Sequence, residues 1–81
     1  MKSQNIPVTM EVIRTALARN LKRYRHKAGL AQERLALEAG IDRTMLSKIE
    51  RQIANPSVET LLKLSNCLGV SISSLFDSDQ N

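Results

Sequence analysis

The sequence predicts a single all-α domain built from five short helices. Its apolar residues recur every three or four positions, which is the spacing of a buried helix face. Its three glycines stand alone at the ends of such stretches, and no segment shows the alternation of a strand. With 81 residues, 42% of them hydrophobic and 2% aromatic, we expect a small domain with an aliphatic core.

The first two helices are expected over 9–28 and 32–39. Pro7 or Thr9 starts the first, and residues 1–8 before it are expected to form a flexible arm. Gly29 ends this helix, and Gly40 supplies the left-handed turn after the second. The residues expected to face the core are Ile13, Ala16, Leu17, Leu21, Tyr24, Leu35, Ala36 and Ala39.

Three further helices are expected before the polar tail at 77–81, so the domain runs over 9–76. Asp42 caps the third helix, which ends near Arg51 or Gln52, and Pro56 keeps the following loop from being helical. Ser57 caps a fourth helix that ends at Leu68 before Gly69, and Ser71 caps a short fifth one. The expected core residues are Val58, Leu61, Leu62, Leu64, Leu68, Ile72, Leu75 and Phe76.

The third helix separates its side chains sharply into two faces. At about 100° per residue, the arc that runs from Arg43 at 0° to Lys48 at about 140° holds only hydrogen-bond donors, namely Arg43, Thr44, Ser47, Lys48 and Arg51. The opposite arc, at about 200–300°, holds Met45, Leu46 and Ile49, and Glu50 falls at the seam near about 340°. Such a helix can pack on a core and enter a DNA groove at the same time.

The net charge of +4 is concentrated around this helix. Residues 19–51 hold nine Lys/Arg and four Asp/Glu, whereas the rest of the chain holds three and four. A local basic surface is typical of a nucleic-acid binder, although a solvated helix face has the same composition. No apolar run is long enough for a membrane span, no secretion signal is evident, and the lone Cys67 fits a reducing cytoplasm.

An enzyme, a metal site and a cofactor are not expected. One histidine and one cysteine, His26 and Cys67, cannot form a metal cage or an evident pair of nucleophile and base. The isolated glycines make no phosphate-binding loop. For Cys67, a small core-adjacent hydrophobe is favoured over a redox switch.

Several motifs occur in an order that resembles the phage-repressor family of helix-turn-helix proteins, the Cro/Xre-like group. They are Gln-Glu-x-Leu-Ala at 32–36, Ala-Gly-Ile at 39–41, Leu-Ser-Lys-Ile-Glu-Arg at 46–51, Asn-Pro-Ser-Val-Glu-Thr-Leu-Leu at 55–62 and Leu-Gly-Val-Ser at 68–71. The resemblance covers about residues 17–76. It implies a compact five-helix lambda-repressor-like DNA-binding domain, with the helix-turn-helix unit at about 32–51.

The resemblance also implies roles for particular residues. The third helix would read the major groove of double-stranded DNA, with base contacts from Arg43, Thr44, Ser47 and Lys48. Phosphate contacts would come from Gln32, Arg51 and Asn55, and Arg25 and Glu50 would form a buried ion pair between the first and third helices. For Arg43, Thr44, Ser47 and Lys48 a phosphate contact remains the alternative, as a base contact does for Arg51, and for Thr44 a role in capping the helix is a further alternative.

Three departures from the family pattern affect these expectations. Ala31 stands where Ser, Thr or Asn usually caps the second helix. Gln52 stands where Gly is usual, so a non-glycine residue would have to accept a left-handed conformation. Ile53 replaces a common Lys or Arg and removes one possible phosphate contact.

The function implied is a sequence-specific transcription regulator, with repression the favoured mode. The alternative is an antitoxin or another protein-interaction module on the same scaffold. Because one short helix reads few base pairs, a homodimer on a pseudo-palindromic operator is expected. Its contact would come from residues 70–76, namely Val70, Ile72, Leu75 and Phe76, unless these are buried within the monomer.

Overall fold

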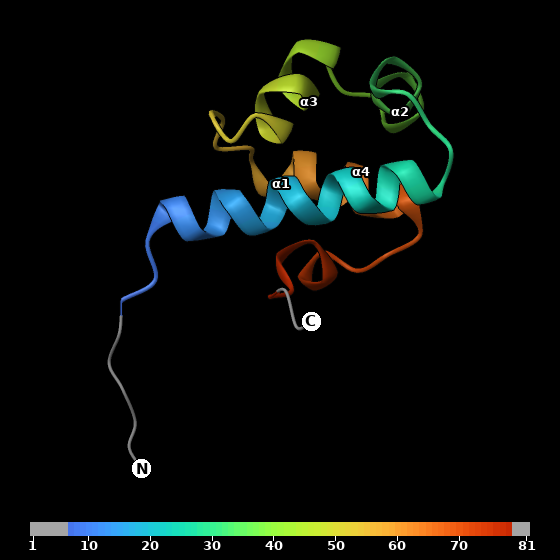
Figure 1. Ribbon diagram of the computed structural model, residues 1–81. Coiled ribbons are helices and arrows are strands. Elements are labelled where there is room, and N and C mark those ends of the chain that lie inside the picture. Colours follow the sequence, from blue (N-terminus) through green and yellow to red (C-terminus); the bar gives the residue numbers. More distant parts are fainter. Residues whose placement is uncertain (1–6, 79–81) are drawn as a thin grey trace.

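The computed structural model describes residues 7–78, and these form four α-helices and one short 3₁₀ helix. The elements are α1 (Met10–Lys27), α2 (Gln32–Ala39), α3 (Arg43–Glu50), α4 (Val58–Leu68) and η1 (Ser73–Phe76). In Figure 1, α1 crosses the middle of the molecule, with α2 and α3 on one side of it and η1 on the other. Residues 1–6 of the predicted arm at 1–8 and residues 79–81 of the predicted tail at 77–81 lie outside the described residues.

The helix ends follow the capping chemistry of the sequence. Thr9, Asp42 and Ser57 each accept a hydrogen bond from a backbone N–H in the first turn of the helix that follows. Gly40 ends α2 with φ of 75°, which turns the chain abruptly into α3. Gln52 does adopt the left-handed conformation, with φ of 67°, and its side-chain oxygen accepts a hydrogen bond from Thr15 at 3.1 Å.

The core is aliphatic and receives side chains from every element. Leu21, Leu35, Leu46, Leu64 and Leu75, one from each of the five elements, are completely buried. Tyr24, Ile41, Met45, Val70 and Phe76 are among the half-buried residues that pack around them. Burying apolar surface is the main favourable term in folding. Because Leu46 and Ile49 of α3 belong to this cluster, their burial determines which side of α3 faces the core.

The fifth helix is shorter than predicted. Residues 73–76 form a single 3₁₀ helix instead of an α-helix, because four residues are too few for a regular α-helical ladder. Ser71 still begins the segment, since its hydroxyl accepts a hydrogen bond from the Ser74 N–H at 3.2 Å. The all-α fold class is confirmed, with four α-helices in place of five.

Two core predictions in α4 are wrong. Val58 is 72% exposed and Leu62 is 47% exposed. Relative to Leu61 they lie about 60° and 100° around the helix axis, so both fall at the outer edge of the buried stripe. Ser65 lies nearer to the centre of the stripe than Leu62 and is buried, with its hydroxyl bonded to the Leu62 carbonyl at 3.1 Å. Two apolar side chains of α4 therefore face outward.

Asn20 is a buried residue that the sequence reading missed. It lies on the core side of α1, and its side-chain amide donates to the carbonyls of Leu75 and Asp77, each at 2.9 Å. These bonds satisfy a buried amide and fix η1 against the middle of α1. Its position three residues after Leu17 and four before Tyr24, on the apolar stripe, was the available signal.

Serine at position 31 should stabilise the domain. Ala31 is the exposed N-cap of α2, and its side chain makes no capping hydrogen bond. Ala31→Ser supplies an acceptor for an unpaired N–H of the first turn and should raise the free energy of unfolding by about 0.5–2 kcal/mol. Thermal denaturation measures the change, with Ala31→Val as a control at the same position whose side chain offers no hydrogen-bond acceptor. A lower melting temperature for Ala31→Ser would contradict this reading of the cap.

Candidate nucleic-acid interface

The exposed face of α3 is polar and mostly basic, as the angular pattern predicted. Arg43, Thr44, Lys48 and Arg51 are exposed and Ser47 is half-buried, whereas Leu46 and Ile49 on the opposite side are 0% and 1% exposed. The Arg51 guanidinium lies along this face, since its Nε donates to the Ser47 hydroxyl at 3.3 Å. The two arcs therefore have separate tasks, one in packing and one available to a ligand.

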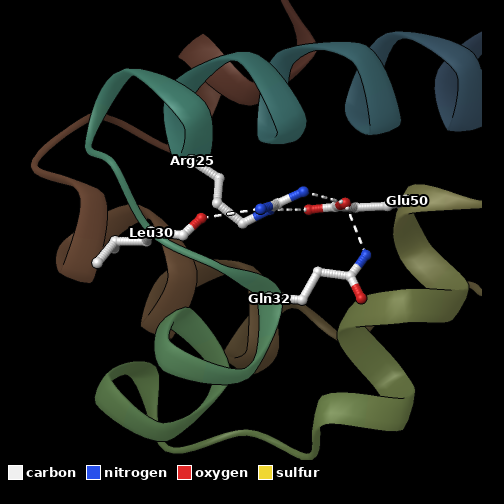
Figure 2. A network of polar contacts seen from close by, with 4 residues as sticks. All are labelled: Arg25, Leu30, Gln32 and Glu50. Carbon is white, nitrogen blue, oxygen red and sulfur yellow. Dashed lines mark hydrogen bonds and ion pairs between the residues drawn. The ribbon is translucent and has the colours of Figure 1, made fainter.

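The orientation of α3 is held by one buried carboxylate, that of Glu50. The Nε and Nη2 atoms of Arg25 donate to its two oxygens at 2.7 and 2.9 Å, in a bidentate ion pair that links α1 to α3 (Figure 2). The side chains of Arg25 and Glu50 are only 10% and 3% exposed. The pair that the resemblance implied is thus present and shielded from water.

Two further contacts extend this network to α2 and to the connection before it. Arg25 Nη1 donates to the Leu30 carbonyl at 2.8 Å, and Gln32 Nε2 donates to Glu50 Oε1 at 2.9 Å (Figure 2). Gln32 is the first residue of α2, and its side chain is half-buried. One carboxylate therefore joins the first, second and third helices, which fixes the helical pair as a rigid unit.

The remaining predicted phosphate contacts lie beyond the end of α3. Arg51 is exposed at the end of α3, and Asn55 is exposed in the loop that leads to α4. Asn55 Oδ1 accepts a hydrogen bond from Arg14 Nη1 at 3.3 Å, which connects the loop to the first half of α1. The sequence reading had assigned no role to Arg14, although its place eleven residues before Arg25 puts the two on the same face of α1.

The remaining features to consider are metal ligands, the Cys67 thiol and membrane-spanning helices. Within residues 7–78, no three His, Cys, Asp or Glu side chains come together in a group that could hold a metal ion. Burial raises the pKa of the Cys67 thiol, and the Glu38 carboxylate near it acts in the same direction, so the thiol stays protonated. No helix among these residues is both long enough and apolar enough to cross a bilayer.

Two short helices joined by a left-handed glycine, with the second one packed on a core and exposing donors, define the helix-turn-helix class of DNA-binding domain. The chain belongs to the HTH_3 helix-turn-helix family, whose model matches residues 21–75. The Cro/C1-type resemblance in the sequence is thereby confirmed.

Named relatives and solved structures agree with this membership. The chain is 41% identical over 64 residues to the HTH-type transcriptional regulator SlrR of Bacillus subtilis, covering 78% of this chain and 42% of SlrR. The hypothetical transcription factor NHTF from Neisseria superposes with a TM-score of 0.82 at 30% identity, covering 98% of this chain and 89% of that one. The structure of SinR, the master regulator for biofilm formation, solved in complex with DNA, superposes with a TM-score of 0.72 at 39% identity. The match covers 75% of this chain and 98% of the SinR chain.

These relatives are mostly longer than this chain. The chain spans about half the length of the first of these curated relatives, such as 42% of SlrR and 55% of a Neisseria meningitidis protein, and up to 77% of the others. What is shared is the domain described above, which is a helix-turn-helix domain of the DNA-binding type found in transcription regulators.

Proposed function

We propose that this protein binds double-stranded DNA at specific sequences and regulates transcription, with α3 lying in the major groove. One observation carries the proposal: the exposed arc of α3 consists of donors, and it is presented by a fold that matches a relative solved with DNA. A major groove about 12 Å wide admits one α-helix and displays a distinct pattern of acceptors for each base pair. Arginine, lysine and hydroxyl side chains can read such acceptors.

The placement of the side chains supports a division of work between bases and phosphates. We assign the base edges to Arg43, Thr44, Ser47 and Lys48, which all lie within the first six residues of α3. The phosphates fall to residues at the flanks of α3, namely Gln32, Arg51 and Asn55. Because the Gln32 side chain already donates one amide hydrogen to Glu50, its free donors are the second amide hydrogen and its backbone N–H.

The active unit that we propose is a homodimer on a pseudo-palindromic operator. An eight-residue recognition helix contacts too few base pairs to select one locus in a genome. Leu75 is completely buried, so it is not available to a partner, whereas Val70, Ile72 and Phe76 are half-buried. The outward-facing Val58 and Leu62 of α4 offer further apolar surface for a second copy.

The mode of action that we propose is repression from the cytoplasm, without catalysis. A protein that occupies a promoter blocks polymerase by its presence alone, and this requires nothing beyond the DNA-binding surface. The surface of α3 does not favour the antitoxin alternative, since every exposed side chain of this helix is polar or charged. A helix that docks on a protein is expected to expose apolar or aromatic anchors.

Selection of binding sites from random duplexes tests the proposal directly. We expect one motif with inverted symmetry, whose half-sites are centred about 34–36 Å apart, and two protein molecules on each selected duplex. Sedimentation with and without that duplex measures the stoichiometry. A protein with both Arg43→Ala and Lys48→Ala is the control, because both residues are exposed and the fold should persist. Failure to enrich any motif would contradict sequence-specific binding, and one protein on an asymmetric motif would contradict the dimer.

A further inference from the structure

We infer that Arg14, together with Asn55, forms a phosphate-binding site on α1 that lies outside the helix-turn-helix unit. The inference rests on the proposed function and adds a contact to it. Arg14 is in the first half of α1 and precedes residues 21–75, the part of the chain that the family model matches.

The position of Arg14 on α1 directs it to the side on which α3 lies. Eleven residues of α-helix complete about three turns, so Arg14 and Arg25 lie within about 20° of one line and about 16.5 Å apart along the axis. Arg25 reaches Glu50 of α3 from this face. Arg14 therefore leaves α1 on the same face, three turns nearer to the start of the helix.

The loop that follows α3 lies against this part of α1. Arg14 Nη1 donates to Asn55 Oδ1 at 3.3 Å, and Thr15 Oγ1 donates to Gln52 Oε1 at 3.1 Å. Figure 1 shows the loop after α3 descending toward the first half of α1. The loop that follows Arg51 thus brings Gln52 and Asn55 against the part of α1 that carries Arg14.

The charge of Arg14 is not neutralised by a carboxylate among residues 7–78. The ion pairs in that part of the chain join Arg25 to Glu50, Arg34 to Glu38 and Lys63 to Glu59. Arg14, Gln52 and Glu11 line a polar surface hollow of about 400 Å³, in which Glu11 is the one acidic residue. Arg14 is half-buried as a residue, and its guanidinium has five N–H donors and one bonded acceptor, the neutral oxygen of Asn55.

This arrangement suits a phosphate better than a base. A guanidinium and a carboxamide N–H₂ side by side supply several donors to one anionic oxygen. They lie past the end of the recognition helix, where the sugar-phosphate backbone borders the groove, and not along its exposed arc. A phosphate contact contributes affinity to every sequence and makes binding more sensitive to salt.

The test compares salt dependence on two duplexes, the selected operator and a mixed-sequence duplex, by fluorescence anisotropy. On both duplexes, Arg14→Gln should reduce the slope of log K against log salt by about 0.9 for each bound protomer, which makes about 1.8 for a dimer on the operator, and it should weaken binding about eightfold per protomer at about 0.1 M salt. Arg14→Lys should keep the slope, because it keeps the charge. Arg23→Gln is the matched control, since Arg23 is exposed on the face of α1 about 180° from Arg14.

A second variant should act in the opposite direction. Glu11→Gln removes the carboxylate from the same hollow and should strengthen binding to both duplexes. A thermal melt of each variant distinguishes a DNA-binding role from a purely structural one. If the contact between Arg14 and Asn55 only stabilised the fold, its loss would lower the melting temperature and leave the salt slope unchanged.

The inference is overturned if Arg14→Gln keeps the wild-type slope, or if Arg23→Gln lowers it equally. If the wild-type protein binds neither duplex, the proposed function and the inference fail together. If the wild type binds and Arg43→Ala relaxes its specificity while Arg14→Gln changes nothing, only the inference fails.

Discussion

Arg25→Ala should lower the free energy of unfolding by about 3–5 kcal/mol, the usual cost of removing one partner from a buried ion pair. The substitution leaves the Glu50 carboxylate, which is 3% exposed, with Gln32 as its remaining side-chain donor. It also leaves the Leu30 carbonyl without the guanidinium that it accepts from. For a domain of 81 residues, such a loss corresponds to a fall of more than about 10 °C in melting temperature.

Urea denaturation of three proteins measures this effect against its control. Arg34→Ala removes the same side chain from an ion pair with Glu38 whose members are 63% and 39% exposed, so the loss there should stay below about 1 kcal/mol. Replacing both partners, as Arg25→Met with Glu50→Leu, should recover most of the stability, because no charge is then left buried. An Arg25→Ala midpoint equal to that of the wild type would show that the pair contributes nothing to folding.

Alanine at position 43 or at position 48 should weaken binding to the selected operator by about 1–3 kcal/mol and relax the preference at one base pair. Both side chains are exposed and lie outside the buried apolar arc of α3. The melting temperature of the free protein should therefore stay nearly constant when either is replaced. The discriminating measurement is the set of affinities for operators changed at single positions. Arg51→Ala is the matched comparison, since a lost phosphate contact weakens binding equally on all of them.

If Arg43→Ala and Lys48→Ala both behave as Arg51→Ala does, both side chains contact the phosphate backbone of the DNA and the base assignment is wrong. Mixed behaviour would assign each position separately. Either result is independent of the ion pair, because neither residue contacts Arg25, Glu50 or Gln32.

Local chemistry made the helical pair predictable. Asp42 caps α3, Gly40 turns the chain before it, and the angular positions of Leu46 and Ile49 gave the buried side correctly. The left-handed Gln52 and the missing cap at Ala31 were anticipated through the resemblance, because the family usually has Gly at the first position and Ser, Thr or Asn at the second. The ion pair of Arg25 and Glu50 was reached through resemblance, since the two residues are 25 positions apart.

What could not be predicted depends on contacts between elements. Apolar character alone assigned Val58 and Leu62 to the core, but α4 packs one narrow stripe and leaves its edge outside. Asn20 was passed over because its partners are backbone carbonyls more than 50 residues away. The bond between Arg14 and Asn55 spans 41 residues, and only the folded chain brings the two together.

The separation of the two arcs of α3 has a consequence for how such a domain changes over generations. The information that folds the helix resides in Leu46, Ile49 and Glu50, and the exposed positions contribute little to it. New side chains at 43, 44 and 48 can therefore be sampled at almost no cost in folding, and under the base contacts proposed above each one would redirect the protein to a different operator. A duplicated copy would be free to acquire a new target while its scaffold stays constant, which makes the domain a ready starting point for retargeting by design.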